Sequence, residues 1–161
     1  MRVAAGLNWH PLHIVASNAG SIGTTFIPAG AEASKGVIIA TWERNPADPT
    51  QADHPAVKDF KVFAARYMPS LDLNNGAAFP DYNNAWMIEQ VLKRCGDDLA
   101  QENLLKQATT LKDMTPPMFI GGIGVYNSPT DYRAVHHLQL TRFDGTTLVP
   151  IGKPALLDDI I

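Results

Sequence analysis

Apolar residues in the first quarter of the chain fall into two short runs. The first lies within His13–Ser17, and the second is the β-branched run Gly36–Thr41, a pattern typical of a parallel strand covered on both faces. Between the runs there is space for a short helix near Thr24–Ile27 and a turn at Pro28–Gly30. Strand, crossover and strand in this order predict a βαβ unit.

The middle of the chain changes to a helical period after a proline-rich connector at residues 45–49. A helix is expected to begin at Pro55 and to end before Pro69. Proline suits the first turn of a helix, because the N–H groups of that turn have no partner within the helix and the missing N–H of proline is therefore not lost. One apolar face is predicted for this helix from the spacing of Ala56, Phe60, Phe63, Ala64 and Tyr67.

Two more helices are expected before the period changes again. The first runs from about Asp81 to Arg94 and ends at Gly96, and its predicted inward face is Ala85, Ile88, Val91, Leu92 and Cys95. The second follows Asp98 and Gln101, which have the spacing of a capping box. Its apolar residues are Leu104, Leu105, Ala108 and Leu111.

The end of the chain has the alternating pattern of a half-buried strand. Leu138 and Leu140 alternate with polar residues and predict one buried face. Asp144-Gly145 follows and is a strong signal for a two-residue hairpin turn.

Composition limits the classes of function. The chain has 161 residues, 45% of them apolar and 18% charged, as expected for a globular domain with a sizeable core. The net charge of −3 and the lack of a basic cluster argue against a nucleic-acid partner or an anionic membrane surface. Cys95 has no partner for an intramolecular disulfide and is expected to be a small buried hydrophobe. Residues 1–7 resemble the last turn of a helix ended by Gly6, which suggests a piece of a longer protein.

Searches for reactive side chains find no catalytic constellation. His136 and His137 are adjacent, and on a strand they would point to opposite faces, so a shared metal is not expected. The glycines at 121, 122 and 124 are followed by a Ser-Pro-Thr turn and not by the helix that a dinucleotide loop requires. We therefore expect no metal, no cofactor and no enzymatic activity, which is consistent with a binding protein.

An ordered set of segments resembles the C-terminal part of a type I periplasmic solute-binding protein of an ABC transporter, in the branched-chain amino-acid (Leu/Ile/Val-binding) family. The resemblance covers nearly the whole chain. It rests on the order in which the segments follow one another, and no single motif decides it. The segments that carry it are Gly6–Pro11, Gly36–Thr41, Asn45–Pro49, Phe60–Tyr67, Gln90–Leu99, Glu102–Ala108, Ser128–Tyr132 and Arg142–Gly145.

The resemblance implies a partial α/β fold of this type, with portions of two Rossmann-like lobes joined by crossover strands. Residues 1–41 would belong to the second lobe, residues 42–137 would form part of the first lobe with two crossovers, and residues 138–161 would return to the second lobe. Each lobe would then be incomplete, so the chain alone is expected to bind solute weakly or not at all.

The resemblance also implies a ligand site between the lobes. Its residues would be Ser17, Asn18 and Ala19 in the loop after the first strand, and Ala77 and Phe79 before the helix near Tyr82. In leucine/isoleucine/valine binders an acidic residue at about the position of Ser17 accepts the ligand ammonium. Serine is a departure that puts α-amino-acid specificity in question, because a neutral hydroxyl pairs a desolvated charge less well.

The implied function is the ligand-binding receptor of an ABC importer for branched-chain amino acids or a related small solute. Its partners would be that solute and an ABC permease, and its location periplasmic, or extracellular and membrane-tethered. Two alternatives stay open: a small flavodoxin-like enzyme or nucleotide-binding domain, and a ligand-sensing regulator on the same fold. An upstream signal peptide would favour the receptor, and an upstream helix-turn-helix would favour the regulator.

Overall fold

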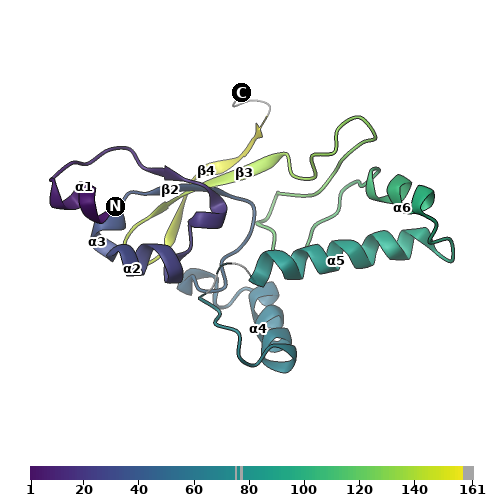
Figure 1. Ribbon diagram of the computed structural model, residues 1–161, viewed down its shortest axis with the longest axis horizontal. Helices are drawn as coiled ribbons and strands as arrows, with labels where there is room; N and C mark the ends of the chain where they lie inside the picture. The colour runs from purple at the N-terminus through teal and green to yellow at the C-terminus, as the bar shows by residue number, and fades with distance from the viewer. Residues whose placement is uncertain (75, 77, 158–161) are drawn as a thin grey trace.

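The computed structural model describes residues 1–74, 76 and 78–157 and contains one mixed sheet (Figure 1). The strands lie in the order β1 (Ile14–Val15), β2 (Ile38–Thr41), β3 (His137–Phe143) and β4 (Leu148–Leu156). β1 and β2 are parallel, whereas β3 is antiparallel to both β2 and β4. The predicted βαβ unit is therefore confirmed, although β1 is shorter than the predicted run.

Short helical turns precede β1 and connect it to β2. They are α1 (Arg2–Gly6), η1 (Ser17–Ala19), a π-helical turn η2 (Ile22–Phe26), α2 (Ile27–Ala29) and α3 (Ala31–Ser34). The turn predicted at Pro28–Gly30 is found in part, because Pro28 and Ala29 belong to α2 and the Gly30 N–H donates to the Ile27 carbonyl oxygen at 3.0 Å. The break comes at Gly30, whose φ of 97° is readily available only to glycine.

One face of the sheet packs on these helices and holds the core. The cluster comprises Ile22, Phe26, Val37, Ile39 and Phe143. Phe26 stacks on Phe143 with ring centroids 4.7 Å apart. A helical turn before β2 is thus fixed to the end of β3.

The predicted alternation in β3 is right, but the predicted buried face is wrong. Gln139, Thr141 and Phe143 are buried, whereas Leu140 is 37% exposed. The polar side chains are satisfied inside, because the Gln139 amide donates to the carbonyl oxygens of Leu140 (2.7 Å) and Ile151 (3.2 Å). Side chains alternate with a period of two, so the Phe143–Phe26 contact orients the whole strand.

Three longer helices follow a short turn, η3 (Pro49–Gln51). They are α4 (Pro55–Tyr67), α5 (Ala78–Cys95) and α6 (Gln101–Ala108), which lie to one side of the sheet in Figure 1. Three helices were predicted, and the bounds of α4 agree with the prolines that flank it. No helix among the described residues is long and apolar enough to cross a membrane.

The buried faces of α4 and α5 differ from the prediction. Val57, Phe60 and Ala64 are the buried residues of α4, whereas Tyr67 is 61% exposed. Met118, from the segment after α6, completes their cluster and so decides which face is covered.

In α5, Ile88 is 60% exposed, while Met87 and Val91 pack on the cluster of Leu111, Phe119, Ile123 and Val125. Cys95 is buried, as expected.

Two predicted local motifs take other forms. Asp98 does not form a capping box, since its carboxylate accepts from the Ala100 N–H (3.0 Å) and α6 begins without a side-chain cap. The β3–β4 hairpin is confirmed, but its loop runs through residues 144–147. The Asp144 carboxylate accepts from the N–H groups of Thr146 and Thr147, which supports this longer turn.

Candidate functional site

A pocket of about 440 Å³ lies where the segments after β1 and β2 meet the start of α5. Its wall combines residues that are far apart in the sequence. Ser17 and Asn18 come from η1, Trp42 and Glu43 follow β2, and Phe79 lies in the first turn of α5. Open α/β sheets place ligands beyond the carboxyl ends of their parallel strands, and this pocket has that position.

Three of the five residues predicted for the ligand site meet in this pocket. Ser17 and Asn18 reach it because η1 begins two residues after β1 ends, and Phe79 faces them from α5. Ala19 is exposed and is not one of the lining residues. Ala77 lies outside the described residues.

Glu43 is a pocket residue that sequence reasoning missed. It lines the main pocket and two neighbouring hollows, together with Thr41. Burial raises the pKa of the Glu43 carboxyl above its ordinary value, a hydrogen bond from Asn83 opposes that shift, and the negative charge of Asp81 raises the pKa further. Because open α/β sheets place ligands beyond the carboxyl ends of their parallel strands, the position of Glu43 two residues after β2 was a signal that could have found it.

Asn83 holds Glu43 from α5. Its amide N–H donates to Glu43 Oε1 at 2.6 Å, and its amide oxygen accepts from the Met118 N–H at 3.0 Å. Asn83 is only 2% exposed, so both contacts are shielded from water. The side chain thus fixes the position of Glu43 relative to α5 and to the segment around Met118.

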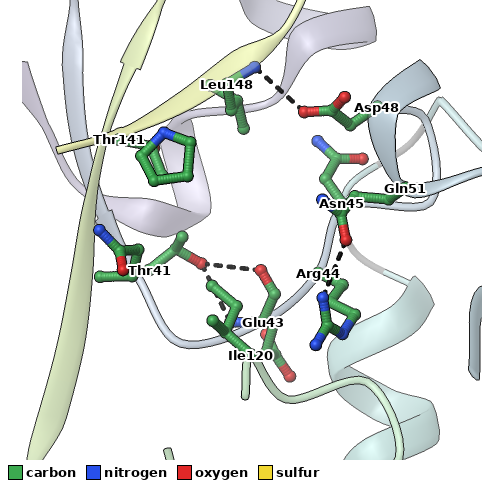
Figure 2. A pocket seen from close by; sticks show the side chains of 11 residues that line it. Thr41, Glu43, Arg44, Asn45, Asp48, Gln51, Ile120, Thr141 and Leu148 are labelled. Atoms are coloured by element: carbon green, nitrogen blue, oxygen red, sulfur yellow. Dashed lines mark hydrogen bonds between the residues drawn. The ribbon is translucent and has the colours of Figure 1, made fainter. Parts of the chain in front are cut away.

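A second hollow of about 160 Å³ continues from Glu43 along the connector toward β4 (Figure 2). Asp48 is buried there and accepts the Leu148 N–H at 3.0 Å, which attaches the connector to the hairpin. The Arg44 guanidinium donates to the Gln51 side chain at 2.9 Å, and its Nε is buried without a partner among the described residues. Burial lowers the pKa of Arg44 below its ordinary value.

A close contact borders the main pocket on the side of η2. The Ser21 hydroxyl donates to the Asn74 carbonyl oxygen at 3.1 Å and also accepts from the Thr24 N–H at 3.3 Å. Gly23 lies so close to Asn74 that an added Cβ would approach the Asn74 Cβ to 2.4 Å. The pocket therefore lies beside a direct contact between η2 and the loop before α5.

The lining suits non-covalent binding of a small polar molecule. It offers hydroxyl and amide groups, aromatic surface from Trp42 and Phe79, and two carboxylates, Glu43 and Asp81. Among the described residues no group of three or more histidine, cysteine or acidic side chains is placed to hold a metal ion. His136 is buried, and its ring stacks on Tyr126 and bonds to two backbone carbonyl oxygens, which gives it a structural role.

Comparison with known proteins gives similarity in structure only. No protein-family model and no curated protein matches the chain. A branched chain amino acid ABC transporter from Thermus thermophilus, solved with bound valine, superposes with a TM-score of 0.74 at 16% sequence identity, over 96% of this chain and 42% of that one. A possible leucine/isoleucine/valine-binding protein from Rhodopirellula baltica SH 1 superposes with a TM-score of 0.65 at 13% sequence identity, over 94% of this chain and 38% of that one.

These likenesses confirm the expected fold. The chain has a partial type I periplasmic-binding-protein fold and spans about two-fifths of the length of the two solved structures (42% and 38%). At 13–16% identity these likenesses show the fold alone.

Proposed function

We propose that this chain is part of a solute receptor that binds a small molecule in the pocket between η1, the segment after β2 and the start of α5. The observation that carries the proposal is the convergence of Ser17, Asn18 and Phe79, predicted from sequence as ligand residues, on one 440 Å³ pocket. The pocket has the size of known small-molecule sites, roughly 300–1,000 Å³.

The division into lobes belongs to this proposal. Residues 1–41 and 138–161 would form part of one lobe, and residues 42–137 part of the other. The placement of α1–α3 with the sheet, and of α4–α6 to one side of it, supports this division (Figure 1). Glu43 follows β2 and pairs with Phe119, which suits a crossing segment between lobes. The solute would lie between the lobes and favour their closure.

Branched-chain amino acids are the first solutes to test, since one structural neighbour was solved with valine. A receptor of this kind would deliver its solute to an ABC permease and act in the periplasm, or outside the cell while tethered to the membrane. Binding without chemical conversion is the expected activity, because the pocket offers hydrogen bonds, charge and aromatic surface for holding a solute.

A thermal-shift screen followed by calorimetry tests the receptor function. The protein in the form its gene encodes is screened against amino acids and related small carboxylates, amides and amines. We expect at least one solute to raise the melting temperature and to bind with a one-to-one stoichiometry, unchanged after prolonged incubation. Conversion of the solute to a product, or no binding at millimolar concentrations of every solute, would refute the proposal.

A further inference from the structure

The charged side chains that line the main pocket are Glu43 and Asp81, and both are acidic. The described residues that line it include no lysine, arginine or histidine. The ion pairs among the described residues involve neither of the two carboxylates. The described lining of this pocket thus carries two acidic side chains and no basic one, and the nearest basic residue along the chain, Arg44, lines the adjoining hollow.

Glu43 is the carboxylate better placed to act on a ligand. Asn83 donates to its Oε1, while Oε2 accepts no hydrogen bond from the described residues. Glu43 is half-buried, whereas Asp81 is exposed and screened by water. A partly desolvated carboxylate is stabilised when a positive charge pairs with it, so a cationic ligand group at Oε2 would gain a charge-assisted hydrogen bond.

The aromatic residues of the wall favour the same kind of ligand. Trp42 and Phe79 line the pocket with the two carboxylates, and aromatic faces attract ammonium and guanidinium groups. Ser17 lies in the same pocket and offers a neutral hydroxyl. The negative charge of the pocket comes from Glu43 in the segment after β2 and from Asp81 on α5.

We propose that Glu43 is the acceptor for the positively charged group of the solute, so that the pocket selects solutes with an ammonium or another cationic nitrogen. This inference rests on the proposed receptor function and adds the class of solute. Asn83 is a positioning residue, because it orients the Glu43 carboxylate from α5. Ser17 and Asn18 would contact the neutral polar part of the solute.

Calorimetry with paired solutes tests this assignment. The probes are the standard amino acids and short alkylamines, each paired with its N-acetyl counterpart, which lacks the positive charge. The protein in the form its gene encodes is compared with Glu43→Gln, which keeps the shape of the side chain, and with Glu102→Gln, which removes an exposed charge on α6. We expect amines to bind, N-acetyl counterparts to lose binding, and Glu43→Gln to weaken affinity by about tenfold or more.

The outcomes separate this inference from the receptor function. N-acetyl counterparts that bind as tightly as the amines, or an unchanged affinity in Glu43→Gln, would overturn the role of Glu43 and leave the receptor function standing. Glu102→Gln is expected to bind like the parent protein, and an equal loss in this control would also overturn the assignment. If neither member of any pair binds while another solute of the wider screen does, the role of Glu43 falls and the receptor function stands, and if nothing in the wider screen binds, both fall. If Glu43→Gln does not fold, the comparison of amines with their N-acetyl counterparts on the parent protein still tests whether the pocket requires a cationic nitrogen.

Discussion

At the scale of single residues, Asn83 is the side chain on which the site geometry depends most. It is buried, and it connects Glu43, Met118 and its own helix through two hydrogen bonds. A buried amide that serves two partners is costly to remove, because each partner is then left without a hydrogen bond away from water.

Asn83→Ala is expected to lower the free energy of unfolding by about 2–4 kcal/mol, because the Met118 N–H and the Glu43 carboxylate both lose their partner. Urea unfolding followed by circular dichroism measures the change. Asn84→Ala is the matched control, since Asn84 is exposed on the same helix and its loss is expected to have little effect. Equal stability of the two variants would contradict the bridging role.

Asn83 and Glu43 also show why sequence patterns find only part of a site. Ser17, Asn18 and Phe79 were predicted from a resemblance that preserves the order of segments. Asn83 was hidden in a helix whose apolar spacing pointed to a different inward face. No periodic signal marks a buried amide, because its partners come from residues about 40 positions before it and 35 after it.

At the scale of elements, the contact between η2 and the loop before α5 closes one side of the pocket. Gly23 is packed against Asn74, and the Ser21 hydroxyl bonds to the Asn74 carbonyl oxygen. Only glycine leaves enough space at this position, because an added Cβ would also come within 3.0 Å of the Asn74 backbone oxygen.

Gly23→Ala is therefore expected to displace η2 from the loop and to destabilise the protein by about 1–3 kcal/mol, the usual cost of overpacking. Gly6→Ala is the control, since nothing lies within 4 Å of its added Cβ and alanine is the better helix former in α1. Thermal unfolding compares the two. A Gly23→Ala variant as stable as Gly6→Ala would mean that η2 and the loop do not touch as described.

The elements themselves were more predictable than their faces. Prolines at 55 and 69 bracket α4, and Leu138–Thr141 alternates as a strand should, so both elements were found. Which face is buried depends on distant partners. Met118 covers Val57 and Phe60 on α4, and Phe26 covers Phe143 on β3, and neither partner is visible in the local pattern.

At the scale of the whole molecule, the second face of the sheet is largely uncovered. Ile14 is 65% exposed, Val149 46% and Leu140 37%, and strand register puts all three on the face opposite Phe143. Exposed apolar surface of this kind marks a place where other structure can pack. The uncovered face agrees with the finding that this chain spans 42% and 38% of the lengths of the two structural neighbours. The uncovered face also fits the proposed division of the chain into parts of two lobes.

Native mass spectrometry of the protein, purified gently in the form its gene encodes, tests the central claim most directly. We expect a non-covalent adduct of one small solute with a cationic nitrogen, released by mild activation and depleted in Glu43→Gln. A protein that carries no solute, and that forms no adduct when amino acids or amines are added at millimolar concentration, would contradict it.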